Sequence, residues 1–391
     1  MSSLSHSGSE SVIMSSPSHT VSATVSVPEG QVALVLLREG DSSFYLRIPL
    51  SIINSLCLKP RKYLLFLGWC ILGSEGVLAL EHDGFAINTE EDLDDQGIYH
   101  YVPTRPLDLV HVVDLEVIKT WTSMLSETSW TCDSFRNKLL ERDVRCLWTG
   151  LVNYGAGLHI IPYKRGSEWF RLIVENRPKY GEDVTTLKDI DDIRNGIYAN
   201  HFIREAFDFR RIAILKTPNH ILNPEDIPPG HDRDVYADVS YPASGRYTLQ
   251  WLEAPDPSQE ILTLVPNNRD ATFKNNTEKP CEKPKPSDLL LQYNYGAAAV
   301  KRWGHGTEVL KNHTSPPRPS MPIHPPIRPS KSFTAGAGTG ESEGQAAWDE
   351  DDVVLFFWAN TQAARERRLK KVEENTQRME QWRRGVHQDS V

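Results

Sequence analysis

Proline and glycine limit which parts of this 391-residue chain can fold into a packed core. Seven prolines lie between Pro316 and Pro329, and Gly- and Ser-rich sequence continues to Gln345. Such a segment forms an extended or flexible linker, because it lacks the large apolar side chains that a core must bury. We therefore predict a disordered linker over residues 305–345 and expect the globular part of the chain before it.

Both ends of the chain also have sequences typical of segments outside a core. Residues 1–20 contain nine Ser and few large apolar residues, which predicts disorder. We predict a helix over residues 346–386, because Asp349 to Asp352 place negative charge at its start, where such charge interacts favourably with the helix dipole. Eight Lys and Arg against four Glu between Thr361 and Arg384 make this helix basic. It is either a helix that binds a protein or nucleic-acid partner or a solvated helix.

Alternating apolar residues predict β-strands in the first third of the chain. The alternation occurs in three stretches, over Val21–Val27, Val32–Leu36 and Phe44–Leu50. Because alternation places every second side chain on one face, these stretches predict an antiparallel meander. The apolar runs Tyr63–Leu72 and Val77–Leu80 are interpreted as further strands. We predict a β-rich N-terminal domain over residues 21–115 and find no catalytic motif in it.

Two helices and a linker are predicted further along the chain. Asp133 or Ser134 can cap a helix whose apolar residues, beginning at Phe135, recur at helical spacing. Residues 254–286 are dominated by Pro, Asn and Lys, which predicts a linker. Residues 287–304 predict a short helix that follows this linker.

Composition narrows the class of protein. The longest apolar run has half of the ~20 residues that a membrane-spanning helix needs, and the Ser-rich N-terminus has no secretory leader pattern. Five scattered Cys form no disulfide framework, which favours a reducing compartment. We expect a soluble, intracellular protein of the nucleus or cytoplasm, without a membrane partner. The net charge of -9 argues against a protein that coats nucleic acid nonspecifically.

Four short motifs follow one another in the middle of the chain. They are Cys146-Leu-Trp-Thr149-Gly150, Leu158-His159-Ile-Ile-Pro162, Arg194-Asn195-Gly196, and His201 followed by Phe207-Asp208. This order resembles the fungal branch of the HNH nuclease family, in which a CxxTG entry precedes HIIP, RNG and a closing HxxFD. The resemblance covers roughly residues 135–255.

The resemblance implies a ββα-metal unit, which we place over residues 133–253. A two-stranded hairpin would carry His159, a loop would carry Asn195, and a helix over Ala199–Ala206 would pack against the hairpin. His159 would act as general base, because an imidazole can take a proton from water near neutral pH. Asn195 would hold its loop through amide hydrogen bonds and so aim the base. The expected fold class is α+β, with a β-rich N-terminal domain, this HNH-like domain, disordered linkers and a C-terminal helix.

Two departures from the family pattern concern the divalent cation, Mg²⁺, Mn²⁺, Ni²⁺ or Zn²⁺, that the resemblance implies. Leu158 stands where many members have a metal-binding Asp or His directly before the first His. Arg204 stands where the closing metal-binding His is normally found, and a guanidinium repels a cation. His201 lies one helical turn earlier and could replace that ligand, although a helix-surface histidine is the simpler interpretation.

Basic residues favour contact with nucleic acid, since Lys and Arg supply the affinity for phosphates. Between Phe135 and His220 there are 15 Lys and Arg but only 11 Asp and Glu. The candidate phosphate contacts are Arg204 and, after the HIIP motif, Lys164, Arg165, Arg171, Arg177 and Lys179. A solvated charged face is the alternative.

The other motif residues have structural interpretations. Cys146 is expected to pack in the core, because no second Cys lies at the spacing of a zinc site. Asn195-Gly196 is a strong turn signal, which is compatible with the functional role of the Asn. The motif residues to which we assign structural roles are Cys146, Thr149, Gly150, Gly196, Phe207 and Asp208.

Three functions remain open. The first is an HNH-type endonuclease that hydrolyses phosphodiester bonds in DNA with a divalent metal ion. The second is a catalytically degenerate HNH domain that binds nucleic acid or protein. The third is a protein in which the pattern is structural only. The sequence does not determine the oligomeric state.

A substitution at Arg204 tests directly whether the change from His to Arg at this position weakens metal binding. Replacing Arg204 by His should raise the affinity for a divalent cation and raise nuclease activity above that of the wild type, because an imidazole binds metals and a guanidinium does not. Isothermal titration with Zn²⁺ or Ni²⁺ and a plasmid nicking assay measure the two effects. Equal metal affinity together with strong cleavage by the wild type would show that the native ligands lie elsewhere.

Overall fold

The computed structural model describes residues 25–93, 97–114, 130–152, 155–228, 245–253, 265–273 and 283–311. These residues form the predicted α+β fold, with helices packed against three separate sheets. The predicted disordered start over residues 1–20 and the predicted C-terminal helix over residues 346–386 lie outside the described residues. Of the predicted linker over residues 305–345, only residues 305–311 are described, and the prediction is wrong there, because they include the short helix α9 (Glu308–Lys311). Among the helices in the described ranges, none is long and apolar enough to cross a membrane.

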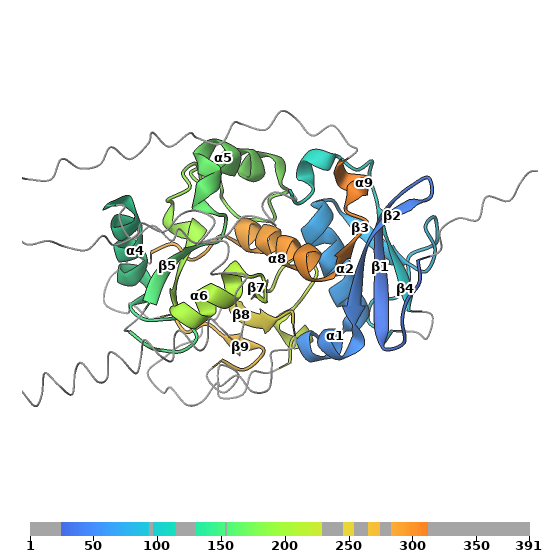
Figure 1. Ribbon diagram of the computed structural model, residues 1–391, viewed down its shortest axis with the longest axis horizontal. Coiled ribbons are helices and arrows are strands. Elements are labelled where there is room, and N and C mark those ends of the chain that lie inside the picture. Colours follow the sequence, from blue (N-terminus) through green and yellow to red (C-terminus); the bar gives the residue numbers. More distant parts are fainter. Residues whose placement is uncertain are drawn as a thin grey trace, which may run out of the picture. The chain divides into compact units, whose positions relative to one another are not determined.

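The largest sheet has five strands in the order β10-β2-β1-β4-β3. Figure 1 labels β1 to β4 of this sheet. β1 (Gln31–Glu39) and β2 (Ser42–Pro49) pair antiparallel, as their alternating apolar residues predict. β4 (Ile98–Pro103) lies parallel to β1 and antiparallel to β3 (Gly76–Ala79). β10 (Gly304–His305) pairs with the outer edge of β2. The predicted antiparallel meander is confirmed for its second and third stretches, which form β1 and β2, but the described residues 25–27 of its first stretch form no strand. The sheet also contains the parallel pair of β1 and β4 and takes in β10 from far along the chain.

Helix α2 (Pro60–Leu72) occupies the run Tyr63–Leu72, which we predicted as a strand. Pro60 is its first residue, and Gly73 ends it in the left-handed conformation at φ 62°. Ten of its 13 residues are buried, because it packs against both the five-stranded sheet and helix α8 (Asp288–Trp303). A helix buried on most sides has a continuous apolar sequence, which does not differ from that of a buried strand.

The motif region and the residues after it form the remaining elements. The motif region contains α4 (Trp130–Asp143), β5 (Gly155–His159), α5 (Gly166–Asn176), β6 (Gly196–Asn200) and α6 (His201–Asp208). A three-stranded sheet follows, with β7 (Ile212–Thr217), β8 (Arg246–Trp251) and β9 (Arg269–Asp270). The short elements are α1 (Leu50–Leu56), α9 (Glu308–Lys311), η1 (Leu109–His111), η2 (Tyr163–Arg165), η3 (Ile193–Asn195) and η4 (Pro224–Asp226).

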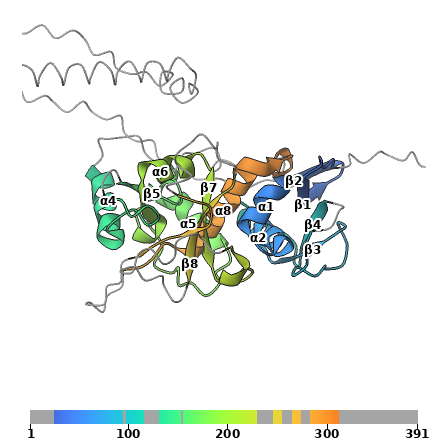
Figure 2. The same cartoon turned by 90° about the horizontal axis from the view of Figure 1, so that it is seen from below.

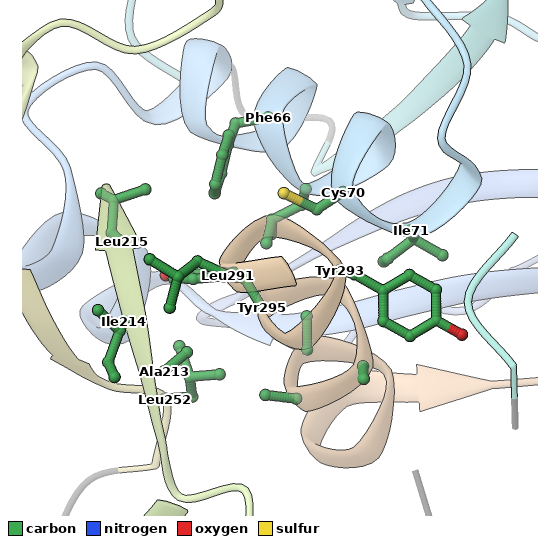
Figure 3. Packing of buried hydrophobic residues seen from close by; sticks show 14 of the residues in the cluster. Phe66, Cys70, Ile71, Ala213, Ile214, Leu215, Leu252, Leu291, Tyr293 and Tyr295 are labelled. Atoms are coloured by element: carbon green, nitrogen blue, oxygen red, sulfur yellow. The ribbon is translucent and has the colours of Figure 1, made fainter. Parts of the chain in front are cut away.

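Helix α8 lies between α2 and β7 (Figures 1 and 2). Figure 3 shows its Leu291 and Tyr295 among Phe66 of α2 and Leu215 of β7. Twelve of its 16 residues are buried. A Cβ atom at Gly296 would lie 2.4 Å from the backbone oxygen of Cys70, so only glycine allows α2 and α8 to approach this closely.

A buried chain of hydrogen bonds joins α8 to three other elements. The hydroxyls of Tyr63 in α2 and Tyr295 in α8 lie 2.7 Å apart, and Tyr295 donates to Oε1 of Gln250 in β8 over 2.6 Å. Gln250 in turn donates to the backbone oxygen of Leu56 in α1 over 2.8 Å. Because unpaired polar groups are costly inside a core, this chain favours one arrangement of the four elements.

The two predicted domains share one core. The described residues of both predicted domains belong to the same compact unit, and one cluster of buried apolar side chains runs from Val32 to Val309. The predicted helix over residues 287–304 is confirmed as α8, and it is the element that joins them.

The predicted linker over residues 254–286 is wrong for residues 265–273. Asp270 in β9 accepts hydrogen bonds from Nε of Arg246 at 3.1 and 3.0 Å and from Thr248 at 2.7 Å. Thr272 bonds through its backbone and its hydroxyl to the backbone oxygen of Leu147. These hydrogen bonds hold polar residues inside the core. A prediction from composition misses them, because it expects core segments to be apolar.

Replacing Gly296 by Ala should lower the free energy of unfolding by about 1–3 kcal/mol, because the new methyl group would meet backbone rather than a movable side chain. Urea unfolding followed by Trp fluorescence measures the loss. The control is Gly157→Ala, whose Cβ would lie 3.2 Å from a methyl of Leu139 and 3.3 Å from the Cα of Arg136, distances that a shift of a few tenths of an ångström relieves. Equal stability of Gly296→Ala and the wild type would show that α2 packs on α8 less closely than the 2.4 Å approach indicates.

Candidate active site

The motif region contains two paired strands, β5 and β6, followed by a helix, as predicted, but the strands do not form a simple hairpin, because η2, α5 and η3 lie between them. β5 and β6 pair antiparallel with His159 opposite Gly196, and α6 follows β6 directly. The predicted start of the helix at Ala199 is wrong, because Ala199 and Asn200 belong to β6. The helix begins at His201, where the Asn200 side chain caps it by accepting from the backbone N–H of Phe202 at 2.9 Å.

His159 is the last residue of β5, and its ring is held on several sides. The ring stacks on Phe135 of α4, with centroids 3.9 Å apart and planes 11° apart, and its centroid lies 5.6 Å from that of Tyr163. Its Nε2 lies 3.1 Å from Oδ1 of Asp191. The residue is only 7% exposed, so these neighbours restrict the orientation of the ring.

Gly196 allows α4 to reach the two paired strands. A Cβ atom there would lie 2.3 Å from the ring of Phe135 and 2.9 Å from Leu139. Phe135 and Leu139 lie on α4, the helix predicted from the apolar residues that begin at Phe135, and both pack with Tyr198 of β6. The glycine of the RNG motif is thus needed because the aromatic side chain that stacks on His159 lies directly over it.

Asn195 makes the side-chain hydrogen bonds that we predicted for it. It is fully buried at the end of η3. Its Oδ1 accepts from the backbone N–H of Ile161 at 2.8 Å, and its Nδ2 donates to the backbone oxygens of Ile161 at 3.2 Å and Ile190 at 2.8 Å. Its own backbone oxygen accepts from Ile160 at 2.8 Å. Asn195 therefore holds the two residues that directly follow His159.

Asn294 of α8 holds the same segment from the other side, and sequence reasoning missed it. Its Nδ2 donates to the backbone oxygen of Ile160 over 2.7 Å. Together the two Asn side chains bond the backbone of Ile160 and Ile161, as a neighbouring strand would. The sequence signal is a polar residue in a mostly apolar stretch of the predicted helix.

Asp191 is the second residue that the sequence interpretation missed. It belongs to the acidic run Asp189-Ile-Asp-Asp192 that directly precedes the RNG motif. The Asp189 side chain accepts from the backbone N–H of Asp191 at 3.0 Å and from the hydroxyl of Ser167 at 3.2 Å. An acidic run is usually a solvated loop, so only the fold distinguishes the carboxylate that bonds His159.

The predicted metal ligands do not come together in the described part of the chain. His201 is exposed at the start of α6, and Leu158 is buried in the core. Nε of Arg204 lies 3.8 Å from Oδ2 of Asp208, one turn along the same helix. No three His, Cys, Asp or Glu side chains among the described residues are grouped so that they could hold a metal ion. These residues therefore do not fit a cation held by three protein ligands.

The candidate phosphate contacts Arg165 and Arg177 have different surroundings in the structure. The Arg165 guanidinium lies over the ring of Trp169, 5.5 Å from its centroid, and the side chain of Lys164 lies outside the described residues. Arg177 is buried and donates to the backbone oxygens of Cys70 at 2.9 Å and Ile71 at 3.3 Å. Burial lowers the pKa of its guanidinium to about 10. Arg177 therefore binds the end of α2, and its predicted contact with phosphate is wrong.

The CxxTG motif forms a tight turn. The Cys146 backbone N–H donates to Leu151 at 2.9 Å, and its oxygen accepts from Gly150 at 2.9 Å. Gly150 has a φ of 71°, which favours glycine, and Thr149 Oγ1 accepts from the Leu151 N–H at 3.3 Å. Cys146 and Phe207 are fully buried in the core, as expected of packing residues.

Comparison of the chain with protein families, curated proteins and solved structures found no match in any of the three. The functional interpretation therefore depends on the geometry of the site and on the motif resemblance.

Replacing Asn195 by Ala should lower the free energy of unfolding by about 2–4 kcal/mol, because three buried backbone groups would lose their partners. Asn176→Ala is the matched control, since its amide donates only to Leu172 within α5, at 2.9 Å. Urea denaturation of both variants measures the difference. Similar stability of the two variants would contradict the role of Asn195 as a link between segments.

Proposed function

We propose that this chain is an HNH-type endonuclease-like hydrolase that cleaves phosphodiester bonds in DNA, with His159 as general base. The observation that supports this most directly is the bonded pair of His159 and Asp191 at the end of β5. A general base is effective when its orientation is fixed, and this ring is fixed by a carboxylate and by a stacked aromatic side chain.

In the proposed reaction, His159 takes a proton from a water molecule whose oxygen attacks phosphorus. The bond from phosphorus to the sugar oxygen then breaks, and the departing oxygen keeps the electron pair and takes a proton from solvent. Lys164 and Arg165 lie on the turn directly after the His motif and are the proposed contacts for a substrate phosphate. The described residues do not form a three-ligand site for a divalent cation, which would polarise the phosphoryl group.

Full-length protein and supercoiled plasmid test this proposal, with Mg²⁺, Mn²⁺, Ni²⁺ and Zn²⁺ added in turn and a chelator as reference. Replacing His159 by Ala should lower the rate of nicking by about 10²–10⁴, the usual contribution of a positioned general base. His82→Ala is the control, because His82 is exposed on a loop of the N-terminal sheet region. An unchanged rate in His159→Ala would exclude this mechanism.

A second candidate function is a degenerate HNH domain that binds nucleic acid or protein without cleavage. The pairing of Arg204 with Asp208 favours it, because Arg204 occupies the position of the expected metal-binding His. Fluorescence anisotropy with duplex DNA distinguishes the two functions. Binding that is unaffected by chelator, together with no nicking under any metal, would favour the binding module.

A further inference from the structure

We propose that Asp191 is a positioning residue that holds His159 in the tautomer with its proton on Nε2. This inference rests on the proposed function, in which His159 is the base, and it specifies which ring nitrogen accepts the proton. A carboxylate accepts hydrogen bonds and donates none, so Nε2 must carry the proton across the 3.1 Å contact. A neutral imidazole has one ring proton, and Nδ1 is then the nitrogen that can accept a proton from water.

The packing around the ring supports this assignment. Phe135 fixes the plane of the imidazole by stacking on it at 3.9 Å. The bond to Asp191 opposes movement of the ring within that plane. Rotation about the Cβ–Cγ bond would also move the ring out of its stack. The carboxylate and the aromatic ring thus constrain different motions, and together they define one orientation.

Asn195 links the two members of the pair. Its Nδ2 donates to Ile190, the residue before Asp191, and to Ile161, two residues after His159. The Asp191 backbone is fixed further by Asp189, which accepts from its N–H at 3.0 Å. One buried amide therefore sets the distance between the strand that carries the base and the loop that carries its carboxylate. This gives the Asn of the motif a role that needs no metal ion.

Nuclear magnetic resonance of full-length protein labelled with ¹⁵N-histidine tests the tautomer without reference to activity. Long-range ¹H–¹⁵N spectra at pH 8.5 distinguish a protonated from an unprotonated ring nitrogen, and the His159→Gln spectrum assigns the His159 signals. We expect Nε2 protonated and Nδ1 unprotonated in the wild type. In Asp191→Asn the side-chain NH₂ can donate to Nε2, so we expect the opposite tautomer to gain population.

The control is Asp192→Asn, because the Asp192 carboxylate bonds Arg194 at 2.8 Å and leaves the contact to His159 in place. We expect its His159 spectrum to match the wild type. A wild-type His159 with its proton on Nδ1, or a spectrum unchanged in Asp191→Asn, would overturn the proposal.

Plasmid nicking by the same variants separates the two proposals. Where the wild type cleaves, Asp191→Asn should lower the rate by between about tenfold and about 10⁴-fold, the range seen when a group that orients a histidine is lost. Asp192→Asn should retain the wild-type rate. If no protein cleaves DNA, the endonuclease proposal fails, while the spectra still decide whether Asp191 sets the tautomer.

Discussion

Helix α8 is the element on which the rest of the structure depends. It packs against α2 on one side and β7 on another, and Gly296 allows the closest of these approaches. Its polar residues are as important as its apolar ones, since Tyr295 bonds to Tyr63 and Asn294 bonds to Ile160. A buried helix that makes specific hydrogen bonds on two faces fixes the position of both neighbours, because each misplaced partner would leave a polar group unpaired in the core.

The candidate site depends on this arrangement. Among the described residues β5 pairs only with β6 and ends at His159, and Asn195 and Asn294 bond the next two residues. The first turn of α8 is also tied to the RNG motif, because the Ser287 N–H donates to the backbone oxygen of Arg194 at 3.0 Å. The segment that follows the proposed base is therefore anchored to the centre of the core, which suits a group that must keep one orientation.

Several Arg side chains of the motif region stabilise the fold. Arg142 bonds the adjacent Asp143 through two pairs of atoms and also donates to the backbone oxygens of Ile193 and Gly196, each at 2.8 Å. Arg177 is buried at the end of α2. A guanidinium has five donors, so it can satisfy several buried carbonyl groups at once. The local excess of positive charge therefore overstates the number of cations that are free to contact a nucleic acid.

Sequence by itself determined the α+β class, the β1–β2 hairpin, helix α8 and the order of strand, strand and helix around His159. These features follow from local periodicity and short motifs, which the chain carries within a few residues. Only the tertiary structure decided that Tyr63–Leu72 is a helix, because a continuous apolar run is compatible with either element when it is buried. The contact of Asp191 with His159 and the contact of Arg177 with the end of α2 could also be seen only in the fold. Each contact joins residues that lie far apart in the sequence, and no local pattern predicts which residues will meet. A carboxylate or a guanidinium in a sequence shows its charge but not its partner, and the partner determines its role.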